Sequence, residues 1–103
     1  MSKFVHVVNF WLKKDLSEVD RAAFIKGVTS LGQIKNLASF HVGRPASTDR
    51  PVIDSSYDYA LVCTFDNLAE HDSYQTDAIH DAFRDQCAQY WDKVLIYDSI
   101  SIE

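Results

Sequence analysis

Basic residues and long apolar runs are scarce in this chain of 103 residues. Ten Lys or Arg residues stand against fifteen Asp or Glu residues, which gives a formal net charge of −5 at pH 7. Lys13 and Lys14 are the only adjacent basic pair, so no basic stripe can follow a phosphate backbone, and we expect no nucleic-acid partner. No apolar run reaches about eighteen residues and no apolar leader precedes Lys3, so we expect neither membrane insertion nor secretion.

Cysteine is also rare, with only Cys63 and Cys87 in the chain. Each lies in an apolar pattern and neither belongs to a C-x-x-C pair, which favours two reduced, buried thiols over a disulfide or a metal site. Asp77 and Asp81 are near a predicted helix start, where carboxylates usually compensate the helix dipole. We therefore expect a cytoplasmic protein with no metal and no cofactor.

The remaining composition is that of one packed domain, which we expect to span residues 1–103, with 47% hydrophobic and 13% aromatic residues. Apolar alternation with period two predicts strands, and Ser17, Asn67 and the pair Thr76 and Asp77 are helix N-cap candidates. We expect strands over 4–12, 37–44, 57–65 and 94–102, and helices from 18 to about 32, over 68–74 and from 77 to about 91 or 92. Residues 45–56 are rich in Pro, Ser, Asp and Thr, which predicts a long loop and a candidate lid over a pocket.

This order of elements predicts an α+β fold of the ferredoxin-like split βαβ type, with a four-stranded antiparallel sheet covered by helices on one face. The other face is left open. His6, Phe10 and Tyr59 lie in strands that are apolar on both sides, so the open face would expose an apolar patch that soluble monomers rarely tolerate. We expect a homodimer whose two sheets close into a dimeric α/β barrel.

The stretch from Tyr74 to Phe83 places a phenol and an imidazole on either side of a helix start. His80 lies one turn into the helix and borders its apolar stripe. The positive end of the helix dipole and partial desolvation both disfavour imidazolium there, so a neutral ring that accepts a proton at pH 7 is expected. A histidine at the edge of the core that merely hydrogen-bonds a neighbour would give the same pattern.

Several motifs occur together in a characteristic order between Val5 and Tyr97. They are the His6, Val8, Phe10 opening, Gly43-Arg44 closing the second strand, the run Tyr57 to Phe65, Tyr74 six residues before the His80 of Ile79-His80-Asp81-Ala82-Phe83, and the ending Asp92 to Asp98. In these motifs the chain resembles the stress-responsive A/B barrel (Dabb) family. The resemblance implies a dimeric barrel of ferredoxin-like protomers, which agrees with the fold argued from patterning.

The family includes a plant polyketide cyclase, olivetolic acid cyclase, which closes a linear polyketide by an intramolecular aldol reaction. The resemblance implies His80 as the base, Tyr74 as its assistant and His6 as a pocket residue. The chain departs from the family at Asp77-Ala78, where a His-Pro pair is usual, and near Gly27-Val28, where a pocket tyrosine is usual.

These residues and the family resemblance together imply three candidate functions. The first is a pocket lined by His6, Tyr74 and His80, with Phe10, Tyr59 and Phe83 as further ligand-binding residues, that holds an apolar or aromatic small molecule. The second is a cofactor-independent, aldol-type cyclase or lyase with His80 as base. The third is a monooxygenase like those of related dimeric-barrel families. A cavity of about 300 Å³ or more lined by the first three residues would favour a ligand-binding or enzymatic role over a purely structural one.

Overall fold

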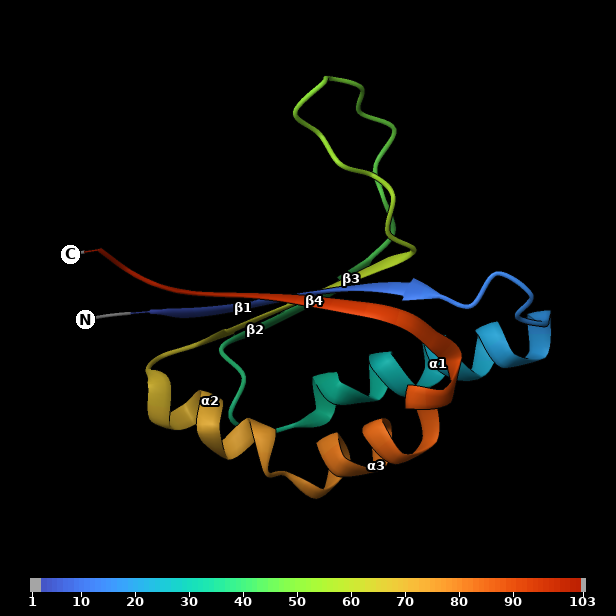
Figure 1. Ribbon diagram of the computed structural model, residues 1–103. Coiled ribbons are helices and arrows are strands. Elements are labelled where there is room, and N and C mark those ends of the chain that lie inside the picture. Colours follow the sequence, from blue (N-terminus) through green and yellow to red (C-terminus); the bar gives the residue numbers. More distant parts are fainter. Residues whose placement is uncertain (1–2, 103) are drawn as a thin grey trace.

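A computed structural model describes residues 3–102, so the start of the chain, on which the expectation of no leader depends, lies outside the described residues. The sheet has the strand order β2-β3-β1-β4, and every neighbouring pair is antiparallel. Figure 1 shows the helices together on one face of this sheet. The elements are β1 (Phe4–Leu12), α1 (Glu18–Ser30), η1 (Leu31–Gln33), β2 (Ser39–Gly43), β3 (Tyr59–Phe65), α2 (Leu68–Gln75), α3 (Ala78–Cys87), η2 (Ala88–Tyr90) and β4 (Trp91–Ile100). The predicted split βαβ fold is confirmed.

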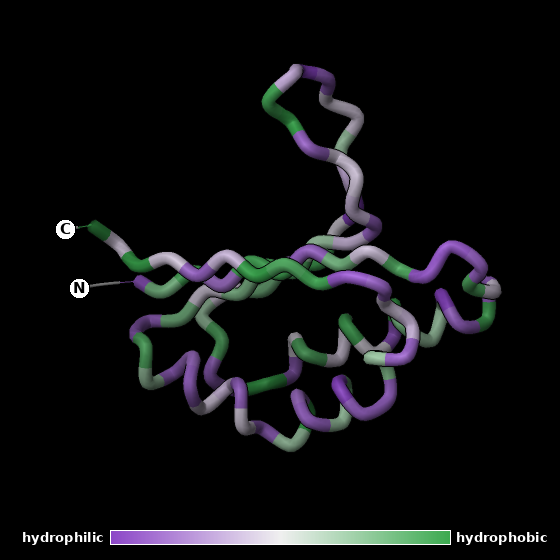
Figure 2. Tube along the Cα trace, viewed as in Figure 1, coloured by the Kyte–Doolittle hydropathy of each residue, from purple (hydrophilic) through white to green (hydrophobic). Residues whose placement is uncertain are grey.

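The side chains of the central strand β1 alternate between the two faces of the sheet along its whole length. Phe4, His6, Val8, Phe10 and Leu12 are buried beneath the helices, and the alternate residues are half-buried on the opposite face. Burial of these apolar side chains stabilises the contact between sheet and helices by about 25 cal/mol per Å² of apolar surface. Figure 2 shows hydrophobic and hydrophilic residues interspersed along the strands, as this alternation requires. Among residues 3–102, no helix is long and apolar enough to cross a membrane.

The helices α1, α2 and α3 each begin at a side-chain cap. The Ser17 hydroxyl accepts from the backbone N–H of Asp20 at 3.1 Å, and the Asn67 side chain accepts from Glu70 N–H at 2.9 Å. The Asp77 carboxylate accepts from Ile79 N–H at 2.8 Å. These caps satisfy amide groups that have no partner within the helix, and they fix where α1, α2 and α3 start, as predicted.

The expectation that the last helix runs to Trp91 or Asp92 is wrong. Helix α3 ends at Cys87, the turn η2 follows, and Trp91 already has extended backbone angles as the first residue of β4. Leu12 is the register partner of Trp91 in the sheet. Pairing with β1 therefore overrides the helical periodicity, and β4 begins three residues earlier than predicted.

The face of the sheet away from the helices is apolar and uncovered in the protomer. It carries the half-buried Val7 and Val62, which are register partners, and Tyr97, which pairs with Val7 from the other side and is 59% exposed. The long loop between β2 and β3 projects from this same face in Figure 1. Its base is anchored by the Asp58 carboxylate, which accepts from Leu12 N–H at 2.8 Å. The loop therefore does not cover the cavity of its own chain that is described below, because that cavity lies under the opposite face.

Candidate functional site

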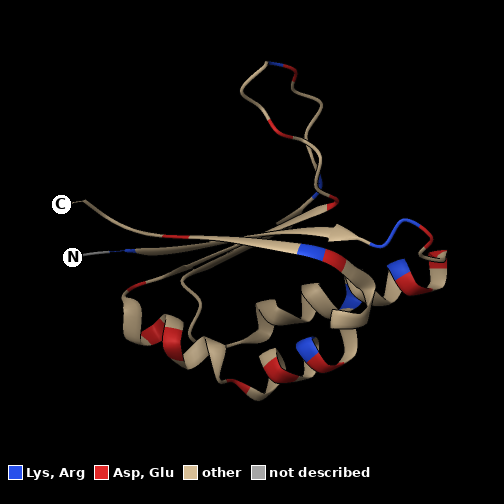
Figure 3. Cartoon of the chain, in the orientation of Figure 1, with Lys and Arg blue, Asp and Glu red and all other residues tan. Residues whose placement is uncertain are grey.

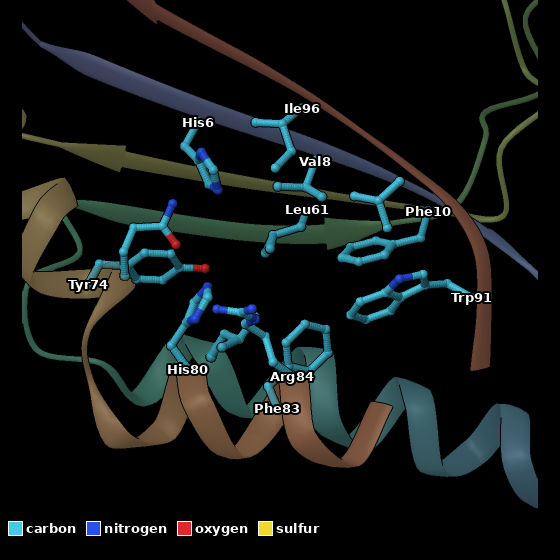
Figure 4. A pocket seen from close by; sticks show the side chains of 13 residues that line it. His6, Val8, Phe10, Leu61, Tyr74, His80, Phe83, Arg84, Trp91 and Ile96 are labelled. Carbon is cyan, nitrogen blue, oxygen red and sulfur yellow. The ribbon is translucent and has the colours of Figure 1, made fainter. Parts of the chain in front are cut away.

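A cavity of about 330 Å³ lies between the helix-covered face of the sheet and helices α2 and α3. His6, Phe10, Tyr74, His80 and Phe83 all line it, as Figure 4 shows. These residues come from three separate elements of the chain, and the fold brings them together. The remaining lining residues are Val8, Leu31, Leu61, Gln75, Arg84, Trp91, Val94 and Ile96.

Tyr59 does not line this cavity, although the sequence placed it among the ligand-binding residues. It lies on the neighbouring strand, where its ring packs 5.6 Å from that of Phe24. Phe24 of α1 is fully buried and fills the space between Tyr59 and Phe10, whose ring is 5.2 Å from Phe24. Helix α1 therefore separates the Tyr59 ring from the cavity.

His80 projects from the first turn of α3, which Asp77 caps. Its Nδ1 atom is buried and has no hydrogen-bond partner in the structure. Burial lowers the pKa of the imidazole, and the nearby Arg84 charge lowers it further, whereas Asp81 and Asp77 act in the opposite direction. The net result is a neutral ring at pH 7 with an unengaged nitrogen, which is the state that a general base requires.

Tyr74 lies at the end of α2 with no solvent exposure, and its ring centroid is 5.0 Å from that of His80. Figure 4 shows the phenol oxygen directed into the cavity beside the imidazole. Its pKa is raised strongly, chiefly by burial and then by Cys63, whose thiol donates to the phenol oxygen at 3.7 Å. The phenol thus stays protonated, and its O–H is free to donate to a molecule in the cavity.

His6 lies on β1 across the cavity, with its ring 5.9 Å from that of Tyr74. Its Nδ1–H donates to the Asp98 carboxylate on the paired strand β4 at 2.5 Å. Burial lowers the pKa of His6 more than Asp98 raises it. The neutral ring therefore has its tautomer fixed by Asp98, and Nε2 is left as a hydrogen-bond acceptor.

His71 stands between the acidic residues Glu70 and Asp72 in the sequence, which predicts an exposed side chain, but the structure buries it. Only 8% of it is exposed, because its face of α2 packs on the end of β1 and stacks the imidazole on Phe4 at a centroid distance of 4.3 Å. Its ring is 5.0 Å from that of His6. Together with Asp98, these two histidines offer ligand atoms within 4.8 Å of one another, so this group is where the described residues could hold a metal ion.

Arg84, Trp91 and Gln75 are lining residues that the sequence did not single out. Arg84 follows His80 by one helical turn, so the i, i+4 spacing could have placed both on one face of α3. Trp91 was missed because it was assigned to a helix. Its ring packs on Phe10 at 5.3 Å and on Phe83 at 5.6 Å, and these three rings form the aromatic end of the cavity.

Comparison with known families gives one clear match. The model of the Stress responsive A/B Barrel Domain family (Dabb) matches residues 4–101, which is nearly the whole chain. No curated protein sequence matches the chain.

Several solved structures share the fold over nearly the full length of both chains. A Dabb family protein with a ferredoxin-like fold from Mesorhizobium loti is 24% identical, with full coverage of both chains and a TM-score of 0.79. A hydroxynitrile lyase from Passiflora edulis is 19% identical over 98% of this chain and 94% of its own, with a TM-score of 0.77. A dimeric ferredoxin-like protein of unknown function from Thermobifida fusca is 18% identical over 95% of this chain and 90% of its own, with a TM-score of 0.76. At these identities the likeness concerns the fold alone.

Proposed function

The chain belongs to the stress-responsive A/B barrel domain family, and we propose that it acts as a single-domain homodimer whose cavity binds a small organic molecule. The observation that carries the proposal is the cavity itself, whose volume of about 330 Å³ falls in the range of small-molecule sites. Its lining is apolar except for a few converging polar groups, among them His6, Tyr74 and His80. Such a lining suits an apolar ligand that carries a carbonyl or hydroxyl group.

The homodimer is supported by the uncovered face of the sheet, on which Val7, Val62 and Tyr97 form an apolar surface. The structural relative from Thermobifida fusca is described as dimeric. A second copy that packed its own sheet on this face would remove the apolar surface from water. Light scattering at micromolar concentration should therefore give twice the protomer mass, and a stable species of 11.7 kDa would contradict the dimer.

Ligand binding is tested with 4-phenyl-2-butanone, a neutral ketone with an aromatic end, by calorimetric titration. Ile96 and Ile100 both lie on β4 and are similarly exposed, at 48% and 53%, but only Ile96 lines the cavity. Ile96→Trp should narrow the cavity and abolish binding, and Ile100→Trp should leave it unchanged. His6→Ala should weaken binding. Saturable binding that Ile96→Trp does not affect would contradict the proposed site.

A second candidate function is catalysis by proton transfer, and the buried, unpartnered Nδ1 of His80 beside the Tyr74 hydroxyl favours it. His80 would take a proton from the carbon next to a carbonyl group, and the Tyr74 O–H would hydrogen-bond the enolate oxygen that forms. The proton then returns to carbon, or the enolate attacks a second carbonyl in an aldol step. One of the structural relatives, from Passiflora edulis, is described as a hydroxynitrile lyase.

This second function has its own measurement. In D₂O, the protein should exchange the hydrogens next to the carbonyl of 4-phenyl-2-butanone, which NMR detects directly. His80→Ala should abolish the exchange. Tyr74→Phe should retain ligand binding but slow the exchange by roughly ten to a thousand times. Binding without any exchange above the buffer rate would leave a carrier rather than an enzyme.

A further inference from the structure

We infer that the cavity takes an organic monocarboxylate, whose carboxylate is bound by Arg84 and whose apolar body lies against Phe10, Phe83 and Trp91. This inference rests on the proposed function, because it names the class of ligand for the same cavity. It adds a role for Arg84, to which the ligand-binding proposal assigns none.

The guanidinium of Arg84 is uncommitted at the mouth of the cavity. Among residues 3–102 it makes neither a side-chain hydrogen bond nor an ion pair within 4.0 Å, although Asp81 precedes it by three residues and Asp85 follows it directly. In Figure 4 it projects from α3 beside the His80 ring. A planar guanidinium carries donors in the geometry that matches a carboxylate, so it can bind that group bidentately.

The cavity is divided into a polar end and an aromatic end. Arg84, His80 and Tyr74 gather toward α2 in Figure 4, and Phe10 and Trp91 lie at the opposite end. The aromatic end is held together by its own ring contacts, including one of 6.0 Å between Phe10 and Phe83. A ligand with one charged head and one apolar tail would satisfy both ends at once, whereas a fully apolar ligand would leave the guanidinium without a partner.

The charge around Arg84 restricts the anion to a single negative charge. Helices α2 and α3 are mainly acidic on their outer sides in Figure 3, and Arg84 is the only Lys or Arg in either helix. The whole chain carries a formal charge of −5. Phosphate esters and other multiply charged anions would be repelled by this acidic surface and would find Arg84 as the one cation in these helices to bind them. The cavity volume of about 330 Å³ is also at the small end for ligand sites, which favours a small ligand.

The test uses a matched pair of probes, 4-phenylbutyrate and 4-phenylbutan-1-ol, which share the aromatic tail and differ in the head group. Calorimetric titrations at pH 7.5 and low salt should show the acid binding about tenfold more tightly than the alcohol, as expected for one partly exposed charge-assisted pair. Arg84→Gln should remove this preference. Arg84→Lys should retain part of it. Arg21→Gln is the control for net charge, because Arg21 lies on α1 and does not line the cavity.

The outcomes separate this inference from the proposed function. Equal binding of acid and alcohol to the unchanged protein, or a preference for the acid that survives Arg84→Gln, would overturn the carboxylate assignment while the ligand-binding cavity stands. Loss of the preference in Arg21→Gln as well would show a general charge effect and would also overturn it. Binding of neither molecule would contradict the proposed function, and the assignment would fall with it.

Discussion

Gly27 should resist replacement by alanine, because α1 and α3 cross at this residue with no room for a side chain. A Cβ atom there would overlap the Sγ of Cys87 and lie 3.4 Å from the Phe83 ring. On an exposed helix face the same change would stabilise the protein by about 1 kcal/mol, since glycine is a poor helix former. Forcing a methyl group into a packed core costs about 1–3 kcal/mol. We expect a net loss of about 1 kcal/mol in the free energy of unfolding, or about 4–8 °C in the melting midpoint.

A double-mutant cycle with Cys87→Ala identifies the cause. Removal of the buried sulfur should alone cost about 1 kcal/mol, because it leaves a small cavity. In the double variant the new methyl group occupies the vacated space, so stability should return close to that of the unchanged protein. The coupling energy is then about 2 kcal/mol. Urea unfolding measures it, at one fixed protein concentration because the stability of a dimer depends on concentration.

Ala22→Gly on the exposed side of α1 calibrates the helix-propensity term in the same helix. If Gly27→Ala stabilises the protein by the amount that Ala22→Gly destabilises it, the two helices do not crowd this residue. If the changes in the free energy of unfolding caused by Gly27→Ala and Cys87→Ala are additive, there is no steric overlap between a side chain at position 27 and Cys87.

Three further predictions concern protons, the site and the interface. The pKa values of His6 and His80 are lowered in the folded protein, so below the ordinary pKa of 6.5 the unfolded chain binds more protons than the folded one. The free energy of unfolding should therefore be highest above pH 6.5 and should fall as the pH drops toward the lowered pKa values. Urea unfolding from pH 7.5 to 5.5 should show this decrease, and the decrease should be smaller in His80→Gln. His80→Ala should leave a folded dimer by circular dichroism and light scattering, and unfolding or dissociation would make the residue structural. Val7→Asp should give a folded monomer, because it puts a charge in the centre of the uncovered sheet face, and an unchanged mass would place the interface elsewhere.

The elements that the sequence predicted well are those fixed by local chemistry. The alternation from Phe4 to Leu12 gives β1 with the expected bounds, because one face of that strand is fully buried. Ser17, Asn67 and Asp77 cap the helices through hydrogen bonds that span only two or three residues. Because these contacts join residues that are close in the sequence, the sequence alone is enough to predict them. The family motifs predicted that His6, Tyr74 and His80 share one cavity, which hydrophobic periodicity could not have predicted.

The residues that were misplaced are those whose environment is set by distant segments. Trp91 is a good continuation of an apolar helical stripe, and only its pairing with Leu12 makes it a strand residue. His71 stands between Glu70 and Asp72, which predicts exposure, yet the packing of α2 on Phe4 buries it. Tyr59 alternates correctly within its strand, but α1 lies between it and the cavity.

The two histidines of the cavity differ in what the fold does for them. The fold gives His6 a fixed acceptor, Asp98, which satisfies one ring nitrogen and sets the tautomer. His80 Nδ1 is buried without any partner, and an unsatisfied buried polar atom costs about 1–3 kcal/mol of stability. A histidine retained only for packing would not need that atom, since a leucine of similar size would fill the space without the cost. This unpartnered nitrogen supports the proposal that a ligand or substrate supplies the missing hydrogen-bond partner, and that His80 rather than His6 accepts a proton from the bound molecule.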